Sequence, residues 1–580
     1  MEKSIYKPGL YPTRPINNLK TMLDGSAALY ANQTAFLVKD RPGGDYLPVS
    51  FRKLREYVDA LGTALLDLGL AGKKIAVIGE NRLEWVLTYL AVTNGVGIIC
   101  PLDRELPAGE IHHLLVRAGV SAVVYSGKVE SAVLEALDGV DTVEHRISMD
   151  AIAPEEDKLS LPRLLRYGRQ LMRQGDMRFS DAVIDPDAIC TLLFTSGTTG
   201  LAKGVMLSHR NIASNVEAMS KVVSVYGFTG LSILPMHHCY ELTCHVMTAL
   251  YQGCTVAICE GLKYIVKNIT EANVNVVVAV PLIFESMHKK LWKQAEKSGK
   301  AEKMRRAVNL AKNLGLNKGR LKPQKKLFKQ IHQALGGDLK LLIAGAAAID
   351  PSVVEDFNAM GFNMIQGYGM TECSPIIAVN MDNYSKAGSA GLPLPGTEVR
   401  IDEPDENGIG EIICRGPSVM LGYYNDPEET ARVLREGWLY TGDYGYLDKD
   451  GFLYVTGRKK NVIVTKNGKN IFPEEVEFYL SKHDYISEVM VYGLEEEKTG
   501  DTIVCAEIFP NFSAIEQEKG QLSEKALHSL LKGLIDAAND QMPPYKRVRR
   551  FYIRYTDFEK TTTHKIKRHL ANAERIEGKE

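Results

Sequence analysis

Residues Leu192 to Val205 read LLFTSGTTGLAKGV, an apolar run that leads straight into a loop of threonine, serine and glycine. The apolar run predicts a buried strand, and the glycines allow tight turns in which backbone amides face an anion. Hydroxyl groups add donors and the lysine adds a positive charge, so the loop suits the phosphates of a nucleoside triphosphate. The residues expected to contact those phosphates are Thr195, Ser196, Gly197, Thr198, Thr199, Gly200 and Lys203.

Two other interpretations of this loop compete with the first. The spacing G-x-x-x-x-G-K-[ST] does not occur in it, which disfavours a P-loop kinase or ATPase. A surface turn rich in glycine and threonine would show the same composition, and the loop alone does not exclude it.

The segments on both sides of the loop alternate between helical and strand patterns. A helical pattern capped by Ser50 opens a series of helices and apolar strands that runs to about residue 125, and strand patterns return from 186 to 380. This strand–helix–strand rhythm predicts mostly parallel sheets. Past about residue 390 short alternating strands take over, with a hairpin signal at Asp450-Gly451.

The composition limits the class of protein. Of the 580 residues 45% are hydrophobic, so the chain is long enough for several domains with large cores. Its 70 Lys and Arg residues balance 71 Asp and Glu residues, and we expect no nucleic-acid partner. The nine cysteines include no C-x-x-C pair, which favours reduced core thiols over disulfides or a zinc site. Because there is no signal-peptide pattern and no apolar run long enough to span a bilayer, we expect a cytoplasmic protein.

Four more motifs follow the loop in order along the chain. They are QGYGMTECSP at 366–375, YTGD at 440–443, GRKKNVIVTKNGKNIFPEEVE at 457–477 and KTTTHKIKR at 560–568. Together with the loop they resemble the adenylate-forming superfamily, which includes acyl-CoA synthetases, luciferases and peptide-synthetase adenylation domains. The resemblance extends from about residue 20 to about residue 570.

The resemblance implies an α/β fold in two domains. The large N-terminal domain is expected to contain two packed α/β layers and a small distorted β-barrel, and the small C-terminal domain is expected to be α+β and mobile. Lys460 is the expected hinge between them. The expected segments are the large domain at 1–459, its α/β subdomains at about 1–185 and 186–385, its β-rich part at about 386–459, and the small domain at 460–580.

The same resemblance implies a nucleotide site. Tyr368 is expected to stack on adenine, Asp443 to accept hydrogen bonds from both ribose hydroxyls, and Arg458 to donate to the same sugar. Each also has an ordinary structural role open to it, in core packing or in a turn. The other residues expected to contact ATP or AMP are Gly345, Ala346, Gly369 and Thr371.

Three residues are expected to act in catalysis. Glu372 is expected to bind Mg²⁺ as a hard carboxylate ligand, with the hydroxyl of Thr195 as its companion. His238, in LPMHHCYE, is expected to orient the substrate carboxylate, and a buried, packed histidine is the alternative. Lys565 is expected to supply the cation for the charge that develops at the α-phosphate.

The match around Lys565 departs from the family at two positions. The family has a proline where this chain has Glu559 and a glycine where it has His564. Histidine tolerates positive φ less well than glycine, which leaves the geometry of this loop open. Lys567 is the rival candidate for the catalytic cation.

We therefore expect a ligase that converts a medium- to long-chain fatty acid, ATP and CoA into acyl-CoA by way of acyl-AMP. The small domain is expected to swing about its hinge and present Lys466, Gly468 and Lys469 to CoA. Apolar stretches at 242–250 and 376–379, with no charged residue suited to an amino acid, favour a fatty substrate.

Two alternatives to this function remain, one within the enzymes and one outside them. The acyl group could pass to an acyl carrier protein instead of CoA, or the chain could be a non-catalytic acyl- or nucleotide-binding module. A serine hydrolase is excluded because no G-x-S-x-G occurs. The acyl chain length and the oligomeric state do not follow from the sequence.

Residues 288–330 form a basic helical insertion. Fifteen Lys and Arg residues there accompany only two acidic residues, Glu296 and Glu302. A solvated helical hairpin is one interpretation, and peripheral contact with the anionic inner face of a membrane is the other. Long-chain fatty acyl-CoA synthetases carry an insertion in this region.

Overall fold

Most of the chain is described by the structure, a computed structural model. The described residues are 9–151, 159–195, 202–314, 322–465, 469–496, 502–560, 566–568 and 570–571. The first long helix, α2 (Phe51–Asp67), begins where the sequence predicts. The Ser50 side chain accepts a hydrogen bond from the Lys53 amide and so caps the first turn.

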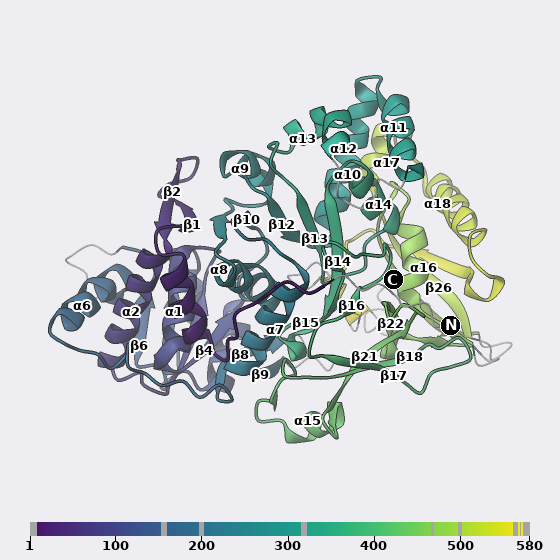
Figure 1. The fold of residues 1–580 in the computed structure, drawn as a ribbon. Helices are drawn as coiled ribbons and strands as arrows, with labels where there is room; N and C mark the ends of the chain where they lie inside the picture. Colours follow the sequence, from purple (N-terminus) through teal and green to yellow (C-terminus); the bar gives the residue numbers. More distant parts are fainter. Residues whose placement is uncertain are drawn as a thin grey trace, which may run out of the picture.

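A mostly parallel sheet carries the glycine-rich segment (Figure 1). The inner strands pair in parallel, whereas β8 and β9 pair in antiparallel fashion, with Thr195 opposite Lys203. The chain between these two strands consists of residues 196–202. Within the described residues the order is β19 (Gly422–Tyr423), β9 (Lys203–Ser208), β8 (Ile189–Thr195), β4 (Ile98–Leu102), β3 (Lys74–Ile78), β5 (Ala122–Tyr125), β6 (His145–Ser148) and β7 (Leu159–Ser160).

A second sheet is parallel at its centre and antiparallel at both edges. Five of its strands match apolar runs predicted between 229 and 380, and two others come from the start of the chain. The described order is β16 (Leu392–Pro393), β15 (Ile376–Val379), β14 (Asn363–Gly369), β13 (Leu341–Ala344), β12 (Val276–Ala279), β10 (Thr229–Ser232), β11 (Thr255–Ile258), β1 (Thr34–Lys39) and β2 (Tyr46–Ser50).

The two sheets exchange segments of the chain. β1 and β2 join the second sheet although they precede residue 185, and β8 and β9 join the first although they follow it. The expected division into 1–185 and 186–385 therefore does not follow the two sheets. A strand pattern shows that a segment is extended, but tertiary packing decides which neighbour it pairs with.

Helices connect these strands and bury their apolar faces against the sheets. Large aromatic side chains such as Trp85, Tyr89 and Tyr251 are almost fully buried in the core that results. The helices are α1 (Leu19–Leu29), α3 (Leu83–Ala91), η1 (Val92–Val96), α4 (Ala108–Ala118), η2 (Gly127–Val129), α5 (Glu130–Ala136), α6 (Leu161–Arg173), α7 (His209–Val222), η3 (Tyr240–Met247), α8 (Thr248–Tyr251), η4 (Leu262–Tyr264), α9 (Ile265–Glu271), α14 (Pro351–Ala359), η6 (Thr371–Cys373) and α15 (Pro427–Val433).

The basic insertion forms a helical lobe at the top of Figure 1. We call it the basic lobe, and its helices are α10 (Pro281–Lys297), α11 (Ala301–Asn313), α12 (Lys322–Leu327) and α13 (Lys329–Ala334). In the part of the chain that the structure describes, no helix combines the length and the apolar character that crossing a bilayer requires.

The β-rich part of the large domain is an open antiparallel sheet rather than the expected barrel. Its described order is β17 (Glu398–Asp402), β18 (Gly410–Arg415), β21 (Trp438–Leu447) and β20 (Leu434–Arg435), with β22 (Leu453–Arg458) also paired to β21. β20 has only two residues, and β22 pairs with β21 alone within this sheet, so neither reaches β17 to close a ring. The predicted hairpin at Asp450-Gly451 is present, because it joins β21 to β22.

The C-terminal part is a smaller α+β unit with a hydrophobic core of its own. In Figure 1 it is the yellow-green region beside the basic lobe. Lys460, the expected hinge, lies in the short helical turn η7 (Lys459–Asn461) that leads into it. Its elements are β23 (Ile463–Val464), β24 (Asn470–Ile471), α16 (Pro473–Ser481), β25 (Ile486–Glu495), β26 (Thr502–Pro510), α17 (Phe512–Lys519), α18 (Glu524–Asn539), η8 (Pro544–Lys546) and β27 (Val548–Ile553).

Candidate active site

Tyr368, Asp443 and Arg458 meet where the second sheet adjoins the open sheet. The hydroxyl of Tyr368, in β14, donates to Oδ2 of Asp443 at 2.7 Å, and Nε of Arg458 lies 2.8 Å from Oδ1. Asp443 and Arg458 are cross-strand partners in β21 and β22. Burial, and then the charge of Asp443, raise the pKa of Tyr368 well above its usual value, so its phenol remains a donor. Three residues predicted to hold adenosine therefore form one connected group.

The segment after β13 runs beside this group. β13 and β14 are parallel neighbours, so Gly345 and Ala346 lie alongside Tyr368. A Cβ on Gly345 would lie 2.6 Å from the hydroxyl of Tyr240, which leaves room only for glycine. Ala346 has a φ of 68°, in the left-handed region that residues with a Cβ rarely adopt. Backbone strain of this kind gathers at binding sites, in keeping with the predicted approach to adenine.

Glu372 is held where β14 turns into η6. The turn requires Gly369, because a Cβ there would lie 1.9 Å from the carbonyl oxygen of Pro375. Glu372 is buried, and its Oε1 accepts a hydrogen bond from the hydroxyl of Tyr423 at 2.8 Å. Tyr423 lies in β19, which pairs with β9. The contact ties this carboxylate to the strand pair that carries the glycine-rich segment.

The surroundings of Glu372 suit a cation that takes most of its oxygen ligands from water and phosphate. Among the residues with described side chains, no group of three or more His, Cys, Asp and Glu is placed to enclose a metal ion. Mg²⁺ commonly binds through one or two carboxylates together with water and phosphate oxygens. A single buried carboxylate linked to the strand pair that carries the glycine-rich segment therefore fits Mg²⁺. Thr195, the predicted second ligand of the metal, is the last residue of β8, which lies in the same sheet as β9 and β19.

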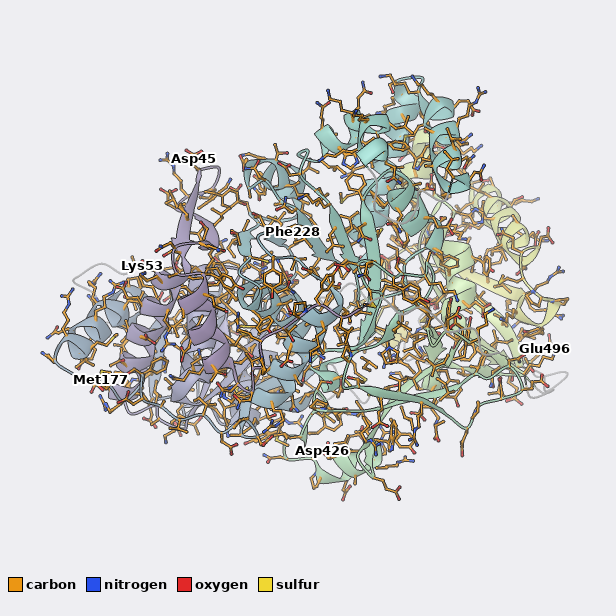
Figure 2. The ribbon with its side chains drawn as sticks, viewed as in Figure 1. Asp45, Lys53, Met177, Phe228, Asp426 and Glu496 are labelled. Atoms are coloured by element: carbon orange, nitrogen blue, oxygen red, sulfur yellow. The ribbon has the colours of Figure 1, made fainter. Side chains whose placement is uncertain are left out.

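Lys203 is paired with an acidic side chain. Its ammonium group forms an ion pair with Glu429, and Nε of Arg432 lies 2.6 Å from Oε2 of the same carboxylate. Hydrogen bonds from Arg432 and Lys203 lower the pKa of Glu429 to about 2. Asp426, labelled in Figure 2, caps the helix α15, which carries both Glu429 and Arg432. A phosphate at the glycine-rich segment would have to compete with Glu429 for this lysine.

Positive charges gather between this segment and the start of the small C-terminal unit. Partial burial, and then the cations Arg458, Arg568 and Lys203, lower the pKa of Lys460. Three basic side chains are therefore close enough to Lys460 to disfavour its charge. Each of these three cations is also paired with a carboxylate, Lys203 with Glu429, Arg458 with Asp443 and Arg568 with Glu477.

His237 and His238 lie side by side, with their ring centroids 4.1 Å apart. Burial is the main cause that lowers the pKa of His237 well below its usual value, and its Nε2 lies 3.5 Å from Oδ2 of Asp103. The next residue, Cys239, donates from its thiol to the hydroxyl of Thr371 at 3.5 Å. The segment with the two histidines is therefore linked to η6, which carries the predicted metal ligand.

Some predicted residues lie outside the described part of the chain, namely Ser196, Gly197, Thr198, Thr199, Gly200, Lys466, Gly468 and Lys565. Lys560 and Ile566, on either side of the segment with Lys565, form an antiparallel bridge. Nζ of Lys469 lies 4.7 Å from the centroid of the Tyr545 ring.

An apolar cavity adjoins the predicted adenosine site. Ala344 and Gly367, which directly precede Gly345 and Tyr368, both line it. Its open space is about 60 Å³, enough for a few water molecules, so a bound chain needs lining side chains to move. Both stretches predicted to form a greasy pocket contribute to the lining, with Cys244, His245, Thr248, Ala249, Ile376 and Val379.

One prediction about this pocket is wrong. The stretch 242–250 does contain an ionisable residue, because His245 lies in it and lines the cavity. Its Nδ1 lies 2.8 Å from Oε1 of Glu241, which directly precedes the stretch. Both side chains are buried, and the i, i+4 spacing in η3 brings them together. The predicted stretch begins at Leu242 and therefore leaves out Glu241, the partner of His245.

Tyr423 and Glu429 were not predicted to take part in the site. The sequence does contain a signal for the helix start, since Asp426 and Glu429 have the spacing of a capping box. No local pattern reveals that Glu429 pairs with Lys203 or that Tyr423 reaches Glu372. Both contacts depend on how β19 packs against β9.

Sequence comparisons agree with the motifs. A family described as AMP-binding enzyme matches residues 23–424, and one described as AMP-binding enzyme C-terminal domain matches residues 475–565. Fatty acyl-CoA synthetase B of Dictyostelium discoideum is 29% identical over 484 residues, which cover 78% of this chain and 71% of the relative. Long-chain-fatty-acid–CoA ligase of Escherichia coli O157:H7 is 27% identical over 517 residues, which cover 84% of each chain.

Solved structures share the fold. Anthranilate CoA ligase in complex with anthranoyl-AMP is similar with a TM-score of 0.75 at 20% identity, over 98% of both chains. The o-succinylbenzoate CoA synthetase of Bacillus subtilis in complex with ATP and a magnesium ion gives a TM-score of 0.71 at 22% identity, over 95% of this chain and 99% of that one. The mixed α/β architecture, with a large N-terminal and a smaller C-terminal domain, is thus common to all three.

Proposed function

The chain belongs to the AMP-binding enzyme family, and on that basis we propose that it is an AMP-forming ligase that joins a medium- to long-chain fatty acid to CoA. The fatty acyl ligases among its relatives support this substrate class. The observation that carries the proposal is that the apolar cavity directly adjoins the group formed by Tyr368, Asp443 and Arg458. A fatty acid in that cavity would present its carboxylate to a nucleotide held by that group.

In the first half-reaction a carboxylate oxygen of the acid attacks the α-phosphorus of ATP, and pyrophosphate leaves. Tyr368 and Asp443 hold the adenosine, and the glycine-rich segment with Lys203 holds the departing pyrophosphate. Lys565 stabilises the negative charge that develops at the α-phosphate. Glu372 and Thr195 would hold Mg²⁺, which would supply further neutralisation of phosphate charge.

In the second half-reaction the thiol of CoA attacks the acyl carbon, AMP leaves with the former carboxylate oxygen, and the thiol proton passes to the released AMP or to water. The small domain pivots at Lys460, so that Lys565 withdraws and Lys466, Gly468 and Lys469 face CoA. His238 orients the acyl carbonyl between the two partners. We favour CoA over an acyl carrier protein because the relatives named above are CoA ligases.

The test is an acid panel with the purified full-length protein. Unbranched acids from octanoate to stearate are supplied with ATP, Mg²⁺ and CoA, and pyrophosphate and acyl-CoA are measured together. We expect equal amounts of both products, with one range of chain lengths preferred. If no acid releases pyrophosphate, the proposal is wrong. If thioester forms only on a carrier protein offered in place of CoA, the acceptor is wrong and the adenylation chemistry stands.

We further propose that the basic lobe contacts an anionic membrane surface, from which the acid is drawn. The side chains of Arg305 and Arg306 are 61% and 80% exposed, and Leu310 and Leu314 nearby are 55% and 62% exposed. Side chains with nitrogen tips project from the lobe in Figure 2. Exposed leucines among basic residues suit a lipid surface, where each basic residue contributes about 1 kcal/mol.

A further inference from the structure

Tyr423 contacts both the residue predicted to bind Mg²⁺ and the lysine predicted to bind phosphate, and the mechanism above gives it no role. Its hydroxyl donates to Oε1 of Glu372 at 2.8 Å. Nζ of Lys203 lies 5.2 Å from the centroid of its ring, within the range of a cation–π contact. Tyr423 is 6% exposed, so both contacts are made in a largely dry environment. One buried side chain therefore connects two groups that are expected to meet the same triphosphate.

The backbone around Tyr423 is fixed from two directions. Its strand β19 pairs with β9, and the backbone N–H of Tyr424 donates to the carbonyl oxygen of Gly204 at 2.7 Å. From the other direction, the backbone N–H of Met420 donates to the carbonyl oxygen of Glu372 at 2.8 Å. The segment that carries the ring is thus attached both to the strand that begins at the predicted phosphate lysine and to the turn that holds the predicted metal ligand.

The hydrogen bond from Tyr423 determines how Glu372 presents its carboxylate. A glutamate side chain has several rotatable bonds, so its carboxylate turns unless a partner holds it. Among the residues that the structure describes, Tyr423 is the side chain that hydrogen-bonds this carboxylate, and it occupies Oε1. Oε2 is left for a metal. Partners of this outer kind orient metal-binding carboxylates and increase the affinity of the site.

We propose that Tyr423 is a positioning residue for the metal and the triphosphate, because its hydroxyl orients Glu372 toward Mg²⁺ and its ring holds Lys203 beside the same phosphates. This inference rests on the proposed function and adds a residue to its first half-reaction. Both contacts serve the neutralisation of phosphate charge, and fixing them on one buried side chain reduces the entropy lost when the nucleotide binds. The two contributions are separable, since phenylalanine keeps the ring and removes the hydroxyl.

The experiment measures ATP binding to the purified full-length protein without acid or CoA, so that no acyl-AMP forms. The dissociation constant of ATP is determined by equilibrium dialysis in EDTA and in saturating Mg²⁺, and the ratio of the two values gives the gain in affinity due to the metal. In Tyr423→Phe we expect this gain to fall by about tenfold or to disappear, because the metal ligand loses its outer partner. The dissociation constant in EDTA should stay close to that of wild type, because the ring still contacts Lys203.

Each other outcome identifies what has failed. An unchanged gain in Tyr423→Phe would show that the hydroxyl does not orient the metal ligand. Equal weakening of ATP binding in EDTA and in Mg²⁺ would mean that Tyr423 only supports the fold. If the wild-type protein binds ATP equally well with and without Mg²⁺, the inference is wrong although the proposed ligase activity stands. If it binds ATP under neither condition, the proposed function itself fails.

Two further variants test the route through Glu372. Tyr424→Phe is the matched control, because this neighbouring tyrosine packs against a different part of the core and its hydroxyl accepts from Nζ of Lys74 at 2.9 Å. It should leave the gain from Mg²⁺ unchanged. In a double-mutant cycle, Tyr423→Phe should have little further effect once Glu372→Gln has removed the charged ligand. Additive effects of the two substitutions would contradict a role that acts through Glu372.

Discussion

Tyr368 Oη and Asp443 Oδ2 lie 2.7 Å apart and so connect β14 of the second sheet to β21 of the open sheet. Arg458 occupies the other carboxylate oxygen of Asp443. A nucleotide would therefore meet a carboxylate whose orientation is already fixed by two partners from different strands. Pre-organisation of this kind reduces the entropy lost on binding, and it makes the three residues interdependent.

Removing the carboxylate should weaken ATP binding strongly. In Asp443→Ala the ribose loses its expected acceptor, and the buried phenol of Tyr368 loses its partner. We expect KM for ATP to rise by about 10- to 100-fold, as is typical of hydrogen bonds to a charged group. Tyr368→Phe keeps the ring and should cost about fivefold or less. Tyr555→Phe, at an exposed position, is the control. An unchanged KM in Asp443→Ala would remove this residue from the nucleotide site.

The contacts of Glu429 with Arg432 and Lys203 should give a pH-dependent stability. The pKa of Glu429 is lowered from 4.5 to about 2, so its contribution is fully present above pH 4.5 and is lost as the pH falls toward 2. We expect Glu429→Gln to reduce the free energy of unfolding at pH 7 by about 1 to 2 kcal/mol after allowance for solvent screening. The difference from wild type, measured by urea unfolding, should narrow between pH 4.5 and pH 3.

A neighbouring carboxylate provides the control for this measurement. Glu428 is exposed in the same first turn of α15 and interacts with the same helix dipole. Glu428→Gln should therefore lose only the interaction with the helix dipole, which is a small part of the free energy of unfolding at pH 7. Equal losses in the two variants would mean that the helix dipole, and not the contacts with Arg432 and Lys203, stabilises this turn.

A methyl group at residue 345 should disturb both substrate sites at once. In Gly345→Ala the new Cβ would lie 2.6 Å from the hydroxyl of Tyr240, which lines the acyl cavity. We expect a loss of about tenfold or more in kcat/KM for the acid, because the ring must turn into the cavity. Gly109→Ala, in α4 with no neighbour near its Cβ, should leave kcat/KM unchanged. Wild-type kinetics in Gly345→Ala would show that Tyr240 can move aside freely.

Charge reversal on the basic lobe should separate membrane binding from catalysis. In Arg305→Glu/Arg306→Glu we expect binding to vesicles of anionic lipid to fall by about tenfold or more, because two favourable contacts become repulsive. Turnover of octanoate in solution should stay the same. Lys525→Glu/Lys532→Glu, on the exposed side of α18, is the matched control. Unchanged vesicle binding by the lobe variant would rule out this lobe as a lipid contact.

Local patterns in the sequence were sufficient to predict most elements of the fold. The cap at Ser50, the apolar runs that became β10 to β14, and the hairpin at Asp450-Gly451 all depend on residues close together in the chain. The exchange of β1 and β2 with β8 and β9 between the sheets could not be predicted, because strand pairing depends on distant packing. The open form of the third sheet escaped prediction for the same reason.

In the candidate site, too, local motifs could be predicted from the sequence, whereas contacts between distant segments could not. The motifs identified Tyr368, Asp443 and Arg458, which are connected in the structure although they come from separate sheets. Contacts between motifs and ordinary segments were missed, such as the pairing of Lys203 with Glu429, since no local signal accompanies them. The pair formed by Glu241 and His245 had a usable signal in its i, i+4 spacing, but a histidine in an apolar helix is more often a packed core residue.

The proposed function depends on transfer of AMP to a fatty acid, and the fate of one oxygen atom tests this most directly. Palmitate labelled with ¹⁸O in its carboxylate is converted with ATP and CoA, and the products are analysed by mass spectrometry. We predict one ¹⁸O atom in the phosphate of AMP and none in pyrophosphate, because the carboxylate oxygen bonds to the α-phosphorus and leaves with AMP. Unlabelled AMP, or label in pyrophosphate or inorganic phosphate, would contradict the mechanism.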